Sequence, residues 1–261
     1  MRLRDCVLII GVVSLAACGA IRNHGIGKIT PVDNGRSSRQ TDSKPDPKRA
    51  VEINIGLAQE YIRSKDYETA LDKLQKAIHI DPSSAAAYSM LGLLYERINR
   101  PVQAGDAYAK SVKLAPDKGD IQNNYAVWLC QSGHAAESDV YFRKALGDPF
   151  YKTPGSALSN AGSCAMSAGK PALAEAYFRQ LLALDPNNPE ALQELAAVLY
   201  QRGDYMRARA FMERRVGVGT PNPQMLDLAS HIEEKLGDRS AADSYRQRLV
   251  NEFPQYTPAQ L

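Results

Sequence analysis

The clearest pattern in the sequence is an alternation of short amphipathic stretches and turns that recurs about every 34 residues. Within each stretch the apolar side chains follow the three-to-four-residue spacing of a helix face. Pro82, Pro116, Pro186 and Pro254 each follow such a stretch. They are separated by one, two and two of these periods, with a two-residue insertion in the second interval. The pattern predicts six repeats, which cover 51–84, 85–118, 119–152, 155–188, 189–222 and 223–256.

Two positions of each repeat hold only small side chains. The eighth holds Ala58, Gly92, Ala126, Gly162, Ala196 and Ser230, and the twentieth holds Ala70, Ala104, Ser138, Ala174, Ala208 and Ala242. Small residues at these places let two helices of one repeat touch. A column of glycines at 133, 169, 203 and 237 suits the left-handed backbone of the turn after a helix. The sequence therefore predicts two antiparallel helices in each repeat.

These columns closely resemble the tetratricopeptide repeat. The second repeat carries the resemblance in Leu91-Gly92, Tyr95, Ala104, Tyr108 and Pro116. The resemblance implies an all-α fold, a right-handed superhelical solenoid of six repeats and twelve antiparallel helices. The sixth repeat departs from the pattern at Glu233 and Arg246, where large apolar residues are usual. A terminal repeat has no following neighbour, so we expect it to have a polar outer face.

The N-terminal part of the chain has the composition of a targeting segment. Residues 1–17 combine a basic start with an uncharged apolar run, as in a secretory signal peptide. Leu15-Ala16-Ala17-Cys18 resembles a bacterial lipobox, which implies cleavage before Cys18 and acylation of that residue. The alternative is an ordinary signal peptide with Cys18 near its cleavage site.

The residues that follow the lipobox predict where the chain is anchored. Residue 19 is Gly, and by resemblance to lipoprotein sorting in Gram-negative bacteria this implies an outer-membrane anchor facing the periplasm. Residues 18–50 contain the lipidated cysteine and a polar stretch that we expect to be a flexible linker. Residues 257–261 form a short tail after the last repeat.

A solenoid of such repeats presents a concave groove, which the first helix of each repeat lines. Helical periodicity places Ile55, Gln59, Ile62, Ser89, Leu93, Arg97, Asn123 and Val127 in the N-terminal half of the groove, and Ser159, Ser163, Gln193, Ala197, Tyr200 and His231 further along. The N-terminal stretch is the more apolar, so we expect a partner protein to bind there. The alternative for Ile55, Ile62 and Leu93 is that they complete the packing between neighbouring repeats.

The residues on the same helices argue against a terminal carboxylate as the ligand. Tetratricopeptide domains that clamp an acidic chaperone tail use lysine, arginine and asparagine at fixed groove positions. Those positions hold Ile55, Gln59, Met90, Asp120 and Asn124 in this sequence. The cationic clamp is absent, so a terminal carboxylate is not the expected ligand.

Two cysteines remain after the signal peptide and the lipobox. Cys130 and Cys164 are separated by one repeat period, on the expected first helices of the third and fourth repeats. An even pair in an oxidising periplasm, at near-equivalent places on neighbouring helices, predicts a disulfide. The alternative is two buried free thiols, which pack well in an alanine-rich core.

Composition narrows the function without naming it. The net charge is +3 with both signs well mixed, which excludes the clustered basic surface of a nucleic-acid-binding protein. The four histidines are scattered without metal-ligand spacing, and no set of nucleophile, base and orienting group can be assembled. The sequence therefore predicts a protein that is not an enzyme and needs no cofactor, metal or small-molecule substrate.

A lipobox, a polar linker and six tetratricopeptide repeats together resemble the type IV pilus biogenesis/stability lipoproteins, the pilotins of the pilus secretin. The stretch Ala191-Leu192-Gln193-Glu194-Leu195-Ala196 and the cysteine pair are also similar to that family. The resemblance implies a lipoprotein that binds secretin subunits in its groove and promotes their outer-membrane localisation and multimerisation. An adaptor for cell-wall hydrolases or outer-membrane assembly factors uses the same architecture and is the alternative.

Overall fold

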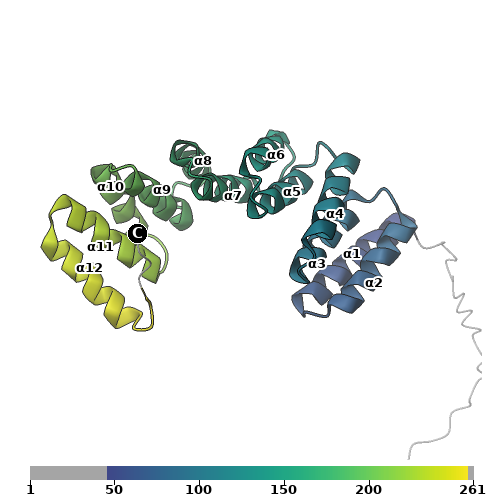
Figure 1. Ribbon diagram of the computed structural model, residues 1–261, viewed down its shortest axis with the longest axis horizontal. Coiled ribbons are helices and arrows are strands. Elements are labelled where there is room, and N and C mark those ends of the chain that lie inside the picture. The colour runs from purple at the N-terminus through teal and green to yellow at the C-terminus, as the bar shows by residue number, and fades with distance from the viewer. Residues whose placement is uncertain (1–45, 258–261) are drawn as a thin grey trace, which may run out of the picture. The chain divides into compact units, whose positions relative to one another are not determined.

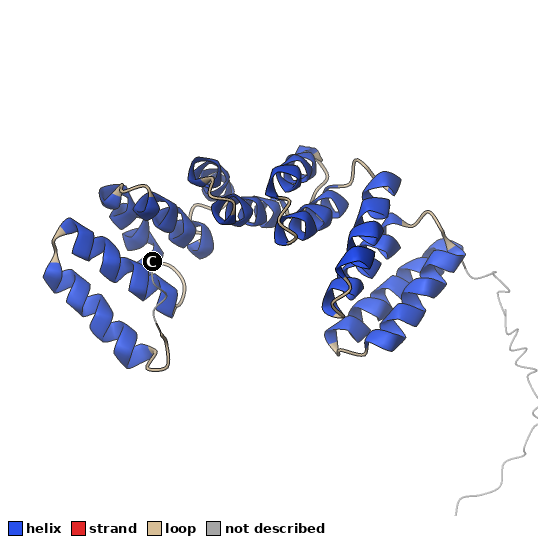
Figure 2. Ribbon diagram, in the orientation of Figure 1, coloured by secondary structure: helices blue, strands red, loops and turns tan. Residues whose placement is uncertain are grey.

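The computed structural model describes residues 46–257, and this part of the chain contains twelve helices and no strand (Figures 1 and 2). The signal peptide, Cys18 and nearly all of the expected linker lie outside the described residues. The helices are α1 Pro47–Arg63, α2 Tyr67–Ile80, α3 Ala85–Arg97, α4 Pro101–Leu114, α5 Gly119–Gln131, α6 Ala135–Gly147, α7 Pro154–Ser167, α8 Pro171–Leu184, α9 Pro189–Gln201, α10 Tyr205–Val216, α11 Pro223–Leu236 and α12 Arg239–Glu252. The fold is all-α, as the sequence predicts.

Consecutive helices pair into six helix-turn-helix repeats, α1 with α2 through α11 with α12. Each first helix also packs against the first helix of the next repeat, from α1 and α3 to α9 and α11. Within the described residues, second helices of neighbouring repeats make no such contact. Closer spacing of the first helices puts them on the inner, concave side, where α5 and α7 lie in Figure 1.

Helix ends follow from local residue choices. The side chains of Asp66, Ser84 and Asn188 accept hydrogen bonds from backbone N–H groups in the first turn of α2, α3 and α9. These bonds satisfy donors that a helix start leaves unpaired. Six helices have proline in the first turn, where its missing N–H costs nothing: α1, α4, α7, α8, α9 and α11.

The turn inside each repeat contains a residue with left-handed backbone at the fifteenth position. Gly133, Gly169, Gly203 and Gly237 have φ between 67° and 84°. In the first two repeats Lys65 and Asn99 adopt the same conformation, with φ of 64° and 56°. The glycine column predicted from the sequence is therefore a column of backbone conformation that extends over all six turns of the described array.

The small residues at the eighth and twentieth positions allow close contact between the two helices of a repeat. Ala58, Ala70, Ala104 and Ala126 are completely buried. A Cβ atom added to Gly92 would lie 2.8 Å from the Tyr108 ring, and one added to Gly162 would lie 2.6 Å from the Phe178 ring. Any side chain at either glycine would collide with the aromatic ring of the second helix.

Two details differ from the expectations drawn from the sequence. The helix α1 begins at Pro47, inside the stretch 18–50 expected to be linker, because Asp46 caps it and Val51 is already buried. Glu233 does not contribute to a polar outer face: it is buried and forms an ion pair with Arg209 of the preceding repeat. Arg246 is on the exposed side of the last repeat, paired with Glu234 and Asp243.

None of the helices within 46–257 combines the length and apolar character of a membrane span.

Candidate protein-binding groove

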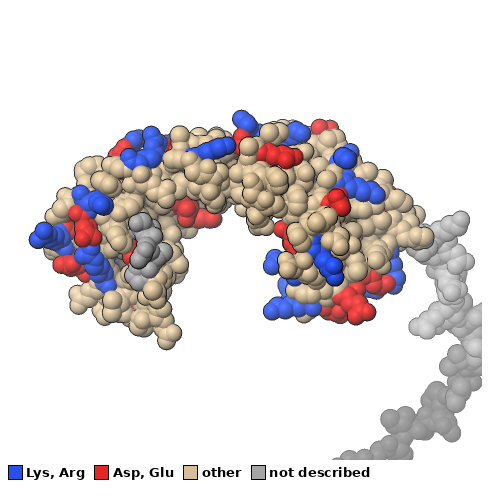
Figure 3. Space-filling view, in the orientation of Figure 1, with Lys and Arg blue, Asp and Glu red and all other residues tan. Residues whose placement is uncertain are grey.

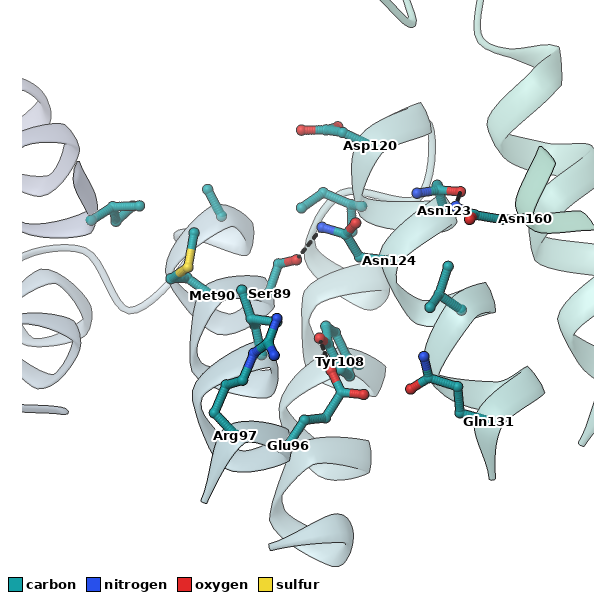
Figure 4. A pocket seen from close by; sticks show the side chains of 15 residues that line it. Ser89, Met90, Glu96, Arg97, Tyr108, Asp120, Asn123, Asn124, Gln131 and Asn160 are labelled. Carbon is teal, nitrogen blue, oxygen red and sulfur yellow. Dashed lines mark hydrogen bonds between the residues drawn. The ribbon is translucent and has the colours of Figure 1, made fainter. Parts of the chain in front are cut away.

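A hollow of about 540 Å³ lies on the concave side of the first four repeats (Figure 4). We call it the groove hollow. Its lining comes from first helices α1, α3, α5 and α7, with Tyr108 of α4 as the one contribution from a second helix. The lining residues are Ile55, Ala86, Ser89, Met90, Leu93, Glu96, Arg97, Tyr108, Asp120, Ile121, Asn123, Asn124, Val127, Gln131 and Asn160.

Six of the eight groove residues predicted for the N-terminal half line the groove hollow. They are Ile55, Ser89, Leu93, Arg97, Asn123 and Val127. Gln59 lies beside it, in a second hollow of about 360 Å³ that Arg97 also borders. Ile62 touches that second hollow too, but its side chain is only 9% exposed and packs with Ala58 and Leu94. Ile62 therefore completes the packing between the first two repeats instead of offering a surface to a partner.

The prediction missed lining residues at the second and sixth positions of the repeat. Asp120 occupies the second position, and Met90, Asn124 and Asn160 occupy the sixth. Positions 2, 5, 6, 9 and 13 follow the i, i+3, i+4, i+7 spacing of one helix face. The face that lines the hollow is therefore wider than the set of groove positions predicted from the sequence. The signal was available, because Met90, Asp120 and Asn124 occupy clamp positions of related domains.

Side-chain hydrogen bonds join the first helices of successive repeats along this face. Asn124 Nδ2 donates to Ser89 Oγ at 3.0 Å, and Asn160 Nδ2 donates to Asn123 Oδ1 at 3.2 Å (Figure 4). These two bonds tie α3 to α5 and α5 to α7. An amide side chain has two donor hydrogens and an acceptor oxygen, so these bonds leave further hydrogen-bonding capacity for a bound chain.

The same kind of bond continues past the groove hollow. Ser159 Oγ on α7 donates to Glu190 Oε1 on α9 at 2.8 Å. Asn222, which caps α11, donates through Nδ2 to Gln193 Oε1 on α9 at 2.9 Å. Polar contacts between neighbouring first helices therefore run from the second repeat to the sixth.

Tyr108 and Glu96 form the polar floor of the groove hollow. The Tyr108 hydroxyl donates to Glu96 Oε2 at 2.6 Å, and the tyrosine is 3% exposed. Burial, and then the neighbouring Glu96 carboxylate, raise the pKa of Tyr108 well above its ordinary range. The phenol therefore stays a neutral donor and keeps the carboxylate in place.

Charge is unevenly distributed between the two sides of the array. In the view of Figure 3, Lys and Arg side chains gather on the outer side over α6, α8 and α10, and the inner side beneath α5 and α7 is mostly uncharged. Arg97 is the one cation of the groove hollow, which also contains the carboxylates of Glu96 and Asp120. This surface suits a largely apolar or hydrogen-bonding ligand.

Cys130 and Cys164 form a disulfide that joins α5 to α7, with their Cα atoms 5.9 Å apart. The predicted pairing is therefore present, and the free-thiol alternative is not. The small residues Ala126 and Ala161 belong to the same buried cluster as Cys164, and Cys130 packs against it. The third and fourth repeats, which both line the groove hollow, are thereby covalently joined.

Within 46–257, no three or more His, Cys, Asp and Glu side chains come together in a group that could hold a metal ion.

Family models identify the repeat along much of the chain. Models described as tetratricopeptide repeat match residues 85–118 and 165–232, and a model described as TPR repeat matches residues 58–99.

The whole array is similar to proteins of type IV pilus biogenesis. The chain is 29% identical to the type IV pilus assembly protein PilF of Pseudomonas aeruginosa, over 82% of this chain and 84% of that protein. The solved structure of PilW, described as a widely conserved type IV pilus biogenesis factor, is 33% identical with a TM-score of 0.71, over 80% of this chain and 96% of that one. The solved structure of P. aeruginosa PilF has 28% identity and a TM-score of 0.71, over 80% of this chain and 95% of that one.

Proposed function

Since the chain belongs to the family of tetratricopeptide-repeat proteins of type IV pilus biogenesis that includes PilW and PilF, we propose that it acts as a pilotin. A role in type IV pilus biogenesis follows from that membership. In the proposed role the protein binds secretin subunits and promotes their localisation and multimerisation in the outer membrane.

The observation that carries the binding part of this proposal is the groove hollow. It combines the apolar side chains of Ile55, Met90, Leu93 and Val127 with hydrogen-bonding amides, on a face built by four repeats. Solenoid proteins use such extended concave surfaces to bind partners. A peptide segment of the secretin would bury its apolar side chains there and pair its backbone with the asparagines.

The delivery part of the proposal rests on the sequence alone. Leu15-Ala16-Ala17-Cys18 resembles a lipobox, and Gly19 fits sorting to the outer membrane. A lipidated Cys18 would hold the array on the periplasmic side of that membrane, together with any secretin subunit bound in the groove. Two or more acyl chains are needed because a single chain binds membranes only marginally.

The test of the binding part is the double variant Ile55→Asp/Leu93→Asp. Both side chains line the groove hollow and are only partly buried, so the array should still fold. We expect the variant to bind the purified secretin at least tenfold more weakly than the unmodified protein, a loss of about 1.4 kcal/mol. The measurement is the dissociation constant by calorimetry, together with a helical circular dichroism spectrum.

The matched control is Val102→Asp/Met206→Asp. Val102 is 73% exposed on α4 and Met206 is 64% exposed on α10, both on second helices. This pair introduces the same two charges outside the groove hollow and should leave secretin binding unchanged. Equal affinities for the two double variants would contradict binding in the groove hollow.

A further inference from the structure

The chemistry of the concave face changes along the array. Apolar side chains of the groove hollow, such as Ile55, Leu93 and Val127, belong to the first three repeats. Amides and hydroxyls follow on α5 and α7, and two carboxylates, Glu190 and Glu194, follow on α9. A segment lying along the groove would therefore meet an apolar surface at one end and an acidic surface at the other.

The repeat register puts both carboxylates on the groove face. Glu190 occupies the second position of its repeat, like Asp120, and Glu194 occupies the sixth, like Asn160. Asp120 and Asn160 both line the groove hollow. Residues four apart on a helix are neighbours on one face. Acidic side chains are visible on the inner side of the array below α9 in Figure 3.

Neither carboxylate has a cation of its own in the described array. Glu175, Asp204 and Glu233 each form an ion pair with an arginine. Glu190 instead accepts a hydrogen bond from Ser159, and Glu194 makes no ion pair. Lys152 borders the same hollow as Glu190, one of about 490 Å³, but does not pair with it.

In the unbound protein, the surroundings of Glu194 disfavour its ionised form. Burial, and then the nearby Glu190, raise the pKa of Glu194 above its ordinary value. A lysine or arginine placed beside the two carboxylates would relieve this repulsion, because an opposite charge within about 4–6 Å favours the ionised form.

From this arrangement we infer that the groove binds a protein segment with apolar side chains at one end and lysine or arginine at the other. The apolar end lies in the groove hollow, and the basic end lies against Glu190 and Glu194 on α9. This inference rests on the proposed function and specifies the chemistry of the bound segment. Complementary charge across an interface fixes register and excludes wrong partners more than it adds affinity.

Three fluorescein-labelled peptides test the inference. They share an apolar first half, and their second half carries several lysines, several glutamines or several glutamates. We expect the purified protein to bind the lysine peptide about tenfold more tightly than the glutamine peptide, a difference of about 1.4 kcal/mol. The glutamate peptide should bind most weakly. Raising the salt from about 0.05 M to about 0.5 M should reduce the preference, because salt screens exposed charges.

Two double variants test whether the preference for the lysine peptide depends on the carboxylates of α9. Glu190→Gln/Glu194→Gln should bind the lysine and glutamine peptides equally. Glu190→Lys/Glu194→Lys should prefer the glutamate peptide, a reversal that a purely structural role of these residues would not produce. The matched control is Glu137→Gln/Glu213→Gln, which changes the net charge equally at exposed, unpaired carboxylates of α6 and α10 and should keep the wild-type preference.

No detectable binding of the lysine peptide, or equal affinity of the unmodified protein for the lysine and glutamine peptides, overturns the inference. A preference that survives Glu190→Gln/Glu194→Gln overturns it as well. Failure of the proposed function would look different: the purified secretin would bind neither the unmodified protein nor the Val102→Asp/Met206→Asp control.

Discussion

At the scale of single residues, the core and the groove meet at Gly92. The Tyr108 ring lies directly over this glycine, and its hydroxyl holds Glu96 at the floor of the groove hollow. The other repeats place Leu74, Phe142, Phe178, Met212 and Arg246 at the position of Tyr108, and none of these side chains has a hydroxyl. A single core contact in the second repeat thus sets one polar group of the binding surface.

Gly92→Ala should destabilise the array, because its Cβ would lie 2.8 Å from the Tyr108 ring. Overpacking of this kind costs roughly 1–3 kcal/mol of unfolding free energy. Gly56→Ala is the control: no atom lies within 4 Å of its added Cβ, so the change should be stabilising through helix propensity. Urea unfolding followed by circular dichroism measures both, and a stable Gly92→Ala protein would mean that the ring moves freely.

At the scale of elements, the helices of the described array make contacts within their own repeat and with the neighbouring repeats, and with no repeat further away. First helices touch first helices of the next repeat through the Ser89–Asn124 and Asn123–Asn160 bonds. The Cys130–Cys164 disulfide is the covalent exception, and it spans the junction of the third and fourth repeats. The connection between α6 and α7 contains the two-residue insertion, so it is longer than the connections α2–α3, α4–α5 and α8–α9 and equal in length to α10–α11.

Cys130→Ser/Cys164→Ser should lower the unfolding free energy by roughly 2–4 kcal/mol, the usual effect of a disulfide that closes a loop of this length. The measurement is the midpoint of guanidinium unfolding, with and without reductant. Reductant should shift the midpoint of the unmodified protein toward that of the double variant, and it should leave the variant unchanged. An unchanged midpoint in the variant would show that the third and fourth repeats need no covalent link.

At the scale of the whole molecule, the proposed binding and delivery functions belong to separate parts of the chain. The array of residues 46–257 contains the groove, and the proposed lipid site, Cys18, precedes it in the sequence. If both proposals hold, removing the lipid should leave secretin binding intact and abolish only the delivery of the complex to the membrane.

Cys18→Ala should therefore separate the two functions. Without an acyl anchor the protein should move from the outer-membrane fraction to the soluble periplasmic or inner-membrane fraction, and secretin multimers should fall with it. The purified Cys18→Ala protein should still bind the secretin with unchanged affinity. Outer-membrane localisation that persists in Cys18→Ala would rule out the lipid anchor.

The sequence by itself determined the repeat, because its signals are local. Small residues at fixed positions, turn glycines and helix periodicity each depend on contacts within one helix pair. They therefore recur in the sequence with the period of the repeat. The left-handed turns at Lys65 and Asn99 show the limit of this reading. They repeat the backbone conformation of the glycine column without its residue type, with the same helix-end hydrogen bond, here from Asp66 N–H to Tyr61 O and from Arg100 N–H to Tyr95 O.

Only the tertiary structure decided which side chains share a surface. The groove hollow combines residues of four repeats, with Asp120 and Asn160 among them. The same packing buried Ile62, which periodicity had placed in the groove, and Glu233, which the terminal place of its repeat had assigned to a polar outer face. Spacing along the chain predicts on which face of its own helix a residue lies. Only the neighbouring helices determine whether that face is exposed to solvent, buried in the core or open to a partner.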